Sequence, residues 1–159
     1  MRQRSESEAD AALVVAFLNT PDVETGADEL ASDSAWIRWA AEHDLPAPGP
    51  GAEARAARDA LRAAAADEGT GPDISVTVAA GVVEGRPRTV ARDAVGAIVL
   101  AAVRLAEAGD WVRVKLCAAE TCRWAFLDES RNRSRSWCSM EVCGNRAKAR
   151  AFRARSKSD

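Results

Sequence analysis

The four cysteines constrain the fold more than any other feature of this 159-residue chain. Cys117 and Cys122 enclose four residues, fifteen residues follow, and Cys138 and Cys143 again enclose four. Two closely spaced pairs separated by a short excursion of chain supply the four soft ligands that a tetrahedral zinc ion takes. The alternative is a pair of disulfides, for which four cysteines allow three connectivities. The spacing therefore predicts one structural Zn²⁺ or two cross-links.

The start of the chain favours zinc over disulfides. Residues 1–10 alternate in charge, and the apolar run 11–18 has no small-residue cleavage site behind it, so we expect no secretory signal. No run of 18 apolar residues exists, so we also expect no membrane span. The predicted location is the cytoplasm. Thiols stay reduced there, and clustered cysteines are more often metal ligands than cross-links.

Further residues of the cysteine segment form a recognisable pattern. The tetrapeptide C-G-N-R occupies 143–146, W-C-S-M occupies 137–140 and F-L-D-E-S occupies 126–130. Together with the four ligand positions, this pattern resembles the CGNR zinc finger over about residues 112–155. In that family the finger closes a two-part protein whose N-terminal part is the ABATE domain, and the members are regarded as stress-induced transcription regulators. The resemblance therefore implies regulation of transcription.

Hydrophobic periodicity predicts an α+β fold with a predominantly helical N-terminal domain, 1–111, and a finger, 112–159. Helices are expected at 8–18, from a cap at Asp33 or Ser34 to about 42, at 53–68 and at 93–108. A strand is expected at 74–78, with a weaker strand or hairpin around 82–90. A strand over 112–116 should lead straight into Cys117 with no flexible tether. The finger should be treble-clef or ribbon-like and should end in a helix.

Two pairs of residues in the N-terminal domain, which we call the body, each have two possible interpretations. F-L-N-T at 17–20 resembles the Asn-Thr motif of the ABATE family. Asn19 and Thr20 either cap the first helix before a proline or face a ligand cleft. Trp36 and Trp39 are either core or an aromatic platform for a ligand. On the third helix, the charged residues are expected to face outward: Arg55, Arg58, Asp59 and Arg62.

Within the finger, several residues are predicted to have architectural roles. Trp124 and Phe126, with Leu127, are expected to cover one side of the metal, and Trp137 belongs to the motif beside Cys138. Ser139 suits the N-cap of the last helix. Gly144 should allow close packing on the knuckle 117–122, and Asn145 should tie that knuckle by hydrogen bonds.

Charge is divided unevenly along the chain. Residues 112–159 hold 12 Lys/Arg and 5 Asp/Glu, a net +7, whereas residues 1–111 hold 10 and 19, a net −9. The loop 128–135 carries alternate arginines, and at about 100° per residue four cations of the last helix share one stripe. These predicted nucleic-acid contacts are Arg131, Arg133, Arg135, Arg146, Arg150, Arg153 and Lys157. A basic loop beside a basic stripe is typical of phosphate binding, and DNA is the expected partner.

The favoured hypothesis is a DNA-binding transcription regulator whose N-terminal domain senses a small-molecule effector or forms a homodimer. A finger that binds protein or has only a structural role, or one that binds RNA, remains an alternative. An enzyme is not expected, because four thiolates leave zinc no open position for water. The single histidine, His43, is predicted to lie at the surface at a helix end.

Overall fold

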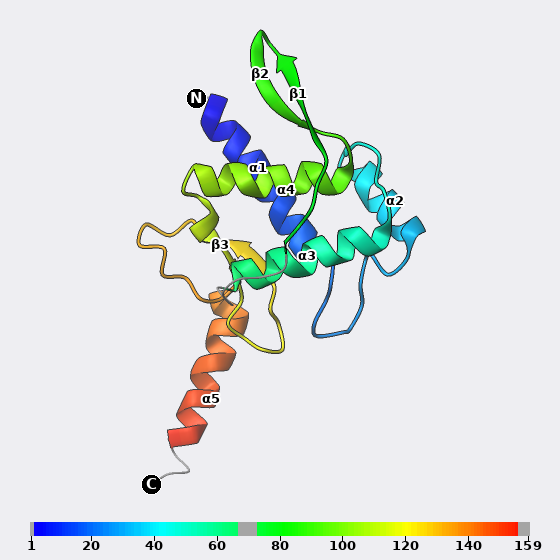
Figure 1. Cartoon of the computed structure of the whole chain (residues 1–159). Coiled ribbons are helices and arrows are strands. Elements are labelled where there is room, and N and C mark those ends of the chain that lie inside the picture. The colour runs from blue at the N-terminus through cyan, green and yellow to red at the C-terminus, as the bar shows by residue number, and fades with distance from the viewer. Residues whose placement is uncertain (1, 67–72, 156–159) are drawn as a thin grey trace.

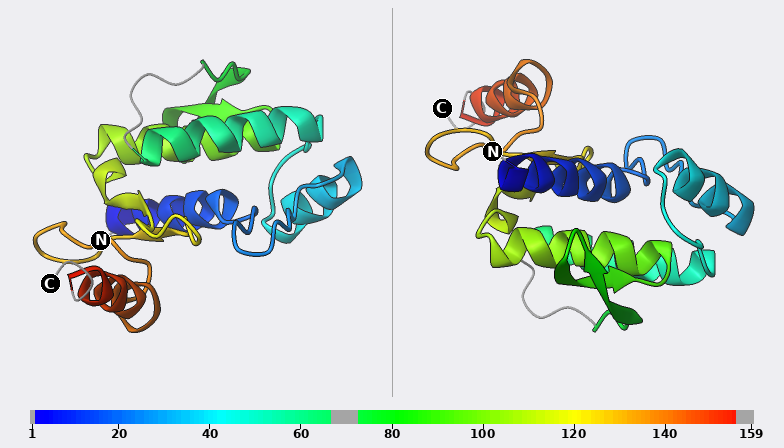
Figure 2. Two further views of the ribbon diagram at one scale, coloured as in Figure 1. Left: turned by 90° about the horizontal axis from the view of Figure 1, so that it is seen from below. Right: turned by 90° about the horizontal axis from the view of Figure 1, so that it is seen from above.

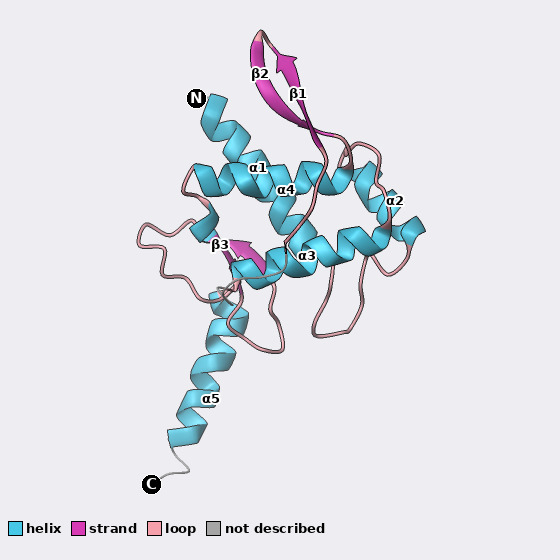
Figure 3. Ribbon diagram, viewed as in Figure 1, coloured by secondary structure: helices cyan, strands magenta, loops and turns pink. Residues whose placement is uncertain are grey.

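The computed structural model describes residues 2–66 and 73–155. Over these residues the chain forms five α-helices and two β-hairpins, an α+β fold that ends in a helix, as predicted (Figures 1 and 3). The elements are α1 (Arg2–Leu18), α2 (Asp33–Glu42), α3 (Gly51–Ala65), β1 (Val78–Val83), β2 (Arg86–Ala91), α4 (Ala94–Glu107), the 3-10 turn η1 (Trp111–Arg113), β3 (Val114–Leu116), β4 (Ala125–Leu127), the π-helical turn η2 (Met140–Gly144) and α5 (Asn145–Arg155).

The body is built in two layers. Figure 2 shows α3 and α4 in one layer, and α1 with the β3–β4 hairpin in the other. The core between them contains Val14 and Phe17 of α1, Ile98 and Leu105 of α4 and Leu61 of α3. The β1–β2 hairpin and α5 extend from opposite ends of the molecule (Figure 1). The finger therefore meets the body through β3 and β4, while its last helix projects away.

Local sequence signals account for most helix ends. Ser32 accepts a hydrogen bond from the Ala35 amide at 3.2 Å, and Asp93 accepts one from the Gly96 amide at 2.7 Å, so both side chains act as N-caps. The first helix begins earlier than predicted, at Arg2, and the third ends at Ala65 rather than at residue 68. Residues 67 and 68 of that predicted helix lie outside the described chain.

The strand predicted at 74–78 is wrong. Pairing begins only at Val78, and Ile74 and Val76 instead pack against the core without joining a sheet. The weaker expectation of a hairpin is confirmed: β1 pairs with β2 in antiparallel register from Val78 opposite Ala91 to Val83 opposite Arg86. Both turn residues, Glu84 and Gly85, have positive φ, at 49° and 75°. Two left-handed residues define the turn that matches strand twist in a two-residue hairpin.

The tryptophans of α2 are core residues. Trp36 is 0% exposed and Trp39 is 5% exposed, and their ring centroids lie 6.1 and 5.5 Å from that of Phe17. The Trp36 indole donates to the Pro48 carbonyl at 2.8 Å, which anchors the segment between α2 and α3. The alternative of an aromatic ligand platform therefore finds no support, because both rings are packed on Phe17. His43 lies at the end of α2, as expected, but it is partly buried and stacks on Trp39 rather than standing free at the surface.

The outward orientation predicted for Arg58 is wrong. Arg58 is 5% exposed, and its guanidinium donates to Asp28 at 2.7 Å, to Asp59 at 3.1 Å and to the Thr20 hydroxyl at 3.2 Å. The Arg58 position falls at about 40° from Ala54 on the helical wheel, inside the sector that also holds Leu61. The buried guanidinium is stabilised because each of these partners accepts a hydrogen bond from it.

Candidate metal centre

The first cysteine pair lies in the turn of the β3–β4 hairpin. β3 and β4 pair antiparallel from Val114 opposite Leu127 to Leu116 opposite Ala125. The ladder continues with the Cys117 amide donating to the Trp124 carbonyl at 2.8 Å. The amides of Cys122 and Arg123 both donate to the Ala119 carbonyl, at 2.9 and 3.0 Å, which folds the intervening residues into a tight knuckle. Both thiols are thereby presented at one end of a hairpin.

The second pair is held at the start of the last helix. The Ser136 carbonyl accepts from the Ala118 amide at 2.9 Å, which fastens the returning chain to the knuckle. Ser139 then caps η2, as predicted, and accepts from the Val142 amide at 3.3 Å. Cys143 lies in this first turn, so one ligand pair comes from a hairpin and the other from a helix start. The placement of Cys143 follows from the expected last helix, whose N-cap is Ser139.

The four sulfur atoms have the geometry of a zinc site. All four lie within 4.8 Å of one another. Cys138 Sγ is 3.6 Å from Cys122 Sγ and 3.8 Å from Cys143 Sγ. Four sulfurs at about 2.3 Å from one ion stand about 3.8 Å apart in a tetrahedron. A disulfide needs about 2.05 Å, and all four cysteines are free. The residues fit one structural Zn²⁺, and the disulfide alternative is wrong.

Burial opposes ionisation of the thiols, a cost that a bound cation would offset. Burial, reinforced by the neighbouring thiols, raises the pKa of both Cys138 and Cys143. Burial opposes ionisation of Cys117 too, but hydrogen bonds from the backbone of Cys138 and Ala119 outweigh it and lower the pKa of Cys117. Four thiolates in one small volume repel each other strongly, and a divalent cation relieves that repulsion. The metal and the folded finger are therefore thermodynamically linked.

The residues that cover the cysteines differ from those predicted. The cluster of Cys117 and Cys143 is completed by Ala119 and by the partly buried Trp137. Trp124 is 43% exposed and Phe126 is buried elsewhere, with the Arg135 guanidinium 5.0 Å above its ring. The prediction that Trp124 and Phe126 cover the metal is therefore wrong, whereas the architectural role of Trp137 is supported.

Gly144 and Asn145 also make different contacts from those predicted. A Cβ at Gly144 would lie 2.8 Å from Sδ of Met140, a flexible side chain of η2 itself, and at an ordinary contact distance of 3.5 Å from Trp137 Cδ1, and no atom of the knuckle is among its three nearest neighbours. The side-chain Nδ2 of Asn145 donates to the Glu141 carbonyl at 3.0 Å within its own helical turn. Asn145 therefore joins η2 to α5 and does not tie the knuckle.

A buried carboxylate, which sequence reasoning placed in a polar loop, organises the chain between the two pairs. Asp128 is 0% exposed and accepts hydrogen bonds from Lys115 Nζ at 2.6 Å and from the amides of Ser130 and Arg135, each at 3.0 Å. Burial opposes its charge, but the bonds from Lys115 and Ser130 hold the pKa of Asp128 well below its usual range. The spacing Asp-x-Ser, typical of an Asx turn, is the signal that could have identified it.

Asn19 connects the body to the finger. Its side-chain amide donates to the Ala125 carbonyl at 2.9 Å and accepts from the Ala125 amide at 2.6 Å, so it pairs with β4 as another strand would. Asn19 is not among the described residues with positive φ, so a left-handed cap is not its role. Thr20 is 2% exposed, donates to the Phe17 carbonyl and accepts from Arg58. Both residues are engaged in packing contacts rather than free in a cleft.

The predicted phosphate contacts fall into three groups. Arg131 and Arg133 are exposed in the finger loop, and Arg146, Arg150 and Arg153 are exposed along α5. Arg135 is instead drawn into the finger, where it donates to the carbonyls of Trp137, at 2.8 Å, and Cys138. Lys157 lies outside the described residues. We call Arg131 and Arg133 of the loop, together with Arg146, Arg150 and Arg153 of α5, the basic surface.

A hairpin knuckle and a helix start that converge on four thiolates define a zinc finger. Consistent with this, residues 113–156 match the sequence model of the CGNR zinc finger, which extends over the whole site. A comparison with curated proteins finds no match. Among the described residues, none of the helices combines the length and apolar character needed to cross a bilayer.

Proposed function

We propose that this protein is a zinc-dependent DNA-binding transcription regulator. The observation that carries the proposal is the exposure of Arg146, Arg150 and Arg153 along a helix that projects from the body (Figure 1). Arginine presents a planar fork that matches phosphate oxygens, and three exposed arginines on one projecting helix can follow a DNA backbone. Among the described residues, the ion-pair partner of Arg146 is the exposed carboxylate of Glu24, at 3.8 Å.

The role of zinc in this proposal is structural. Bound zinc supplies the cross-link that orients η2 and α5 relative to the β3–β4 hairpin, because its ligands come from both parts. Phosphates would be held by the arginines of the basic surface. An enzymatic role is not proposed, since four thiolate ligands complete a tetrahedral shell and leave no position for a reacting water. A reducing compartment such as the cytoplasm would keep the thiols available.

The body would supply regulation. Its F-L-N-T segment resembles the Asn-Thr motif of the ABATE family, and stress-induced transcription regulation is the role which that resemblance implies. Asn19 places this motif in direct contact with β4, at 2.6 and 2.9 Å from Ala125. A change in the body, whether from a small-molecule effector or from formation of a homodimer, would reach the finger through this contact.

A second candidate function is protein binding by the finger. Met140 and Val142 of η2 are each 47% exposed and Phe152 of α5 is 65% exposed. Apolar side chains at such positions are typical of protein-binding helices, since they gain free energy when another surface covers them. In this alternative the finger recruits a partner and the arginines serve solubility.

Fluorescence anisotropy with a labelled 30-base-pair duplex library at low salt tests whether the finger binds DNA. We expect the zinc-loaded protein to bind, and the triple variant Arg146→Ala, Arg150→Ala, Arg153→Ala to bind at least tenfold more weakly. The matched control replaces three exposed body arginines, Arg38, Arg86 and Arg92, with alanine. This control has the same net charge as the first variant, so it separates a local contact from a general charge effect.

Equal weakening by both triple variants, or the absence of binding by the zinc-loaded protein, would refute the DNA proposal. Protein binding would be supported if Phe152→Ser abolished capture of a nuclease-resistant partner while DNA binding stayed absent. RNA binding would show as a preference for a single-stranded or structured RNA competitor over duplex DNA in the same titration.

A further inference from the structure

The β1–β2 hairpin projects from the body with two unequal edges. Figure 1 shows β2 on the side of the hairpin toward the start of α1 and β1 on the opposite side. The Arg88 guanidinium of β2 pairs with the Glu6 carboxylate of α1 at 3.6 Å, which ties β2 to that helix. Among the described residues, β1 and β2 form a two-stranded sheet, so the far edge of β1 has no strand beside it.

The hydrogen-bond pattern shows which backbone groups of β1 face this open edge. In an antiparallel pair, residues that exchange bonds with the opposite strand alternate with residues whose N–H and C=O point outward. The Arg92 amide donates to the Thr77 carbonyl at 3.4 Å, which makes Thr77 an inward-facing residue. By alternation, the outward-facing residues of β1 are Val78, Ala80 and Val82.

The two edges differ in the features that prevent unwanted strand pairing. β2 carries Arg86, Pro87 and Arg88, and charged side chains and proline are what natural sheets use to protect an edge. Pro87 lies opposite Val82, so the N–H that it lacks belongs to an outward position. β1 reads V-A-A-G-V-V and has neither a charge nor a proline. The chain therefore protects the edge of β2 and leaves that of β1 suited to pairing.

The side chains of β1 favour an apolar neighbour. Val82 is 74% exposed and Val78 is 44% exposed. Because side chains alternate along a strand, both valines lie on one face together with Ala80. A two-stranded hairpin is marginally stable at best in water, whereas an additional strand stabilises it. Pairing of another apolar strand with β1 would remove these valines from water.

A second copy of β1 matches this edge. Antiparallel pairing about a two-fold axis at Ala80 places Ala80 opposite its own copy and Val78 opposite Val82 of the second copy. All three residues face outward, so each N–H and each C=O meets a partner. The uncharged β1 strands bring no like charges together, whereas two β2 edges would oppose arginines. The edge is therefore self-complementary in hydrogen bonds, apolar contact and charge.

We propose that this protein forms a homodimer in which the β1 strands of two copies pair antiparallel about Ala80, giving one four-stranded sheet. The proposed function includes a homodimer, and the edge of β1 is the surface that forms it. A role of the dimer in reading DNA rests on that proposed function, whereas formation of the dimer does not.

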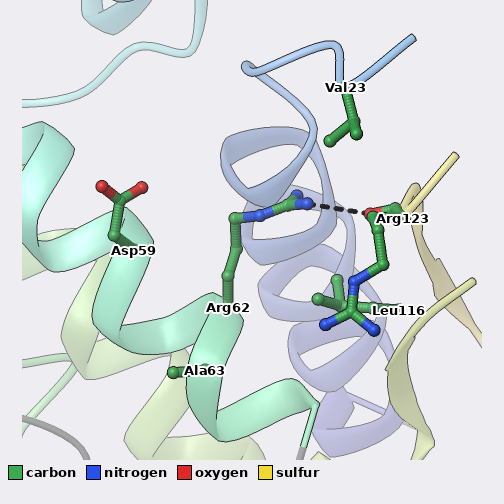
Figure 4. Close-up of a pocket in the computed structure, with 6 residues that line it drawn as sticks. All are labelled: Val23, Asp59, Arg62, Ala63, Leu116 and Arg123. Carbon is green, nitrogen blue, oxygen red and sulfur yellow. Dashed lines mark hydrogen bonds between the residues drawn. The ribbon is translucent and has the colours of Figure 1, made fainter. Parts of the chain in front are cut away.

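Dimerisation through β1 would leave the finger uncovered. The finger is joined to the body at a different place, where Arg62 of α3 donates to the Arg123 carbonyl at 2.9 Å, and Figure 4 shows this junction. Helix α5 extends from the end of the molecule opposite the hairpin (Figure 1). The two fingers would therefore lie at the outer ends of the dimer, where each basic surface is accessible to one half-site of a two-fold symmetric DNA.

Sedimentation equilibrium of the zinc-loaded full-length chain, without DNA and under reducing conditions, measures the dimer directly. We expect a monomer–dimer equilibrium between about 10 µM and 1 mM. The Kd should be on the order of 100 µM, because so short an edge forms few bonds against the entropic cost of association.

Two proline variants test which edge pairs. Ala80→Pro removes an outward N–H at the axis and should raise the Kd by about tenfold or more. Thr89→Pro is the matched control, because Thr89 lies opposite Ala80 and faces the outer edge of β2. The control should leave the Kd unchanged. Pro87 already occupies an outward position of the same hairpin, and zinc content and Tm measured on each variant show that it is folded.

A charge exchange tests the two-fold register. Ala80 is exposed, so a charge at this position stays in water in the monomer. Ala80→Lys and Ala80→Asp each place two like charges on the axis, and each variant alone should dimerise about threefold more weakly or worse. An equimolar mixture of the two should form a heterodimer about as tight as the parent dimer, because opposite charges then meet.

The proposal is overturned if the parent chain remains monomeric at about 1 mM, or if Ala80→Pro and Thr89→Pro dimerise alike. It is also overturned if the two charged variants show no preference for each other. A dimer without DNA binding would remove the proposed function and leave the β1 interface standing, and DNA binding without a dimer would do the reverse.

Discussion

The buried carboxylate of Asp128 is the most exacting test of how the finger is stabilised. Its Oδ1 accepts from the Ser130 amide at 3.0 Å, and its Oδ2 accepts from Lys115 Nζ at 2.6 Å and from the Arg135 amide at 3.0 Å. Three donors therefore face the group, and both of its oxygens are bonded. Asp128→Asn preserves the shape but turns one oxygen into a donor, so an N–H must face either Ser130 or both Lys115 and Arg135.

The asparagine will adopt whichever of these two orientations loses less free energy, and that orientation sets the expected destabilisation. With its oxygen kept toward Lys115, the asparagine loses the Ser130 bond and leaves that amide unsatisfied, at roughly 1 to 3 kcal/mol. The Lys115 bond changes from an ion pair to a bond between the ammonium and a neutral amide oxygen, which costs about 1 kcal/mol more. Lys115 is 25% exposed, so water relieves part of its lost pairing. The expected loss in the free energy of unfolding is about 3 kcal/mol.

Urea unfolding of the zinc-loaded protein, followed by release of zinc to a chromogenic chelator, measures this loss. Asp59→Asn is the matched control, because Asp59 also pairs with a cationic side chain, that of Arg58, but its own side chain is 67% exposed. We expect less than about 1 kcal/mol for the control. A loss below about 0.5 kcal/mol for Asp128→Asn, or one equal to that of the control, would refute the reasoning.

Three further predictions concern the metal, the junction and the body. Cys143→Ser should abolish stoichiometric zinc binding, because structural zinc contributes about 10 kcal/mol to folding in such modules, and elemental analysis would contradict this if one ion per chain remained. Asn19→Ala should cost about 2 kcal/mol in thermal unfolding, since two bonds to Ala125 are lost; an unchanged Tm would argue against the junction. Burial opposes the charge of Asp28, but its bond from Arg58 lowers its pKa, so the contribution is present above about pH 4 and is lost as pH falls through the folded pKa. The stability difference between the parent and Asp28→Asn should therefore shrink on acidification, and a constant difference in urea titrations at several pH values would contradict it.

The metal centre could be predicted from the sequence because the residues that form it lie close together along the chain. The spacing of two cysteine pairs fixes which four thiols can converge, and a capping serine fixes where the last helix begins. Helix α4 could also be predicted from local sequence, since its apolar period and its Asp93 N-cap indicate the same starting point. The tetrahedral sulfur arrangement then needs no contact from distant parts of the chain.

The contacts of the junction were harder to predict because they join distant segments. Asn19 bonds Ala125 across 106 positions, and no local pattern indicates such a partner. The helical wheel places Arg58 on the same face as Ala54 and Leu61, which indicates burial. Its charge favoured an exposed position instead, because an arginine is buried only when acceptors surround it. Trp124 and Phe126 were assigned to the metal by proximity in sequence, whereas the β4 strand turns Phe126 toward Arg135.

The salt dependence of DNA affinity tests the central claim most directly. Each phosphate neutralised by a side chain contributes about 0.9 to the slope of log K against log salt. The account predicts that replacing Arg146, Arg150 and Arg153 with alanine lowers this slope by about 2 to 3, whereas the equally charged control at Arg38, Arg86 and Arg92 leaves it within error of the parent. Identical slopes for all three zinc-loaded proteins would contradict the assignment of DNA binding to the basic surface.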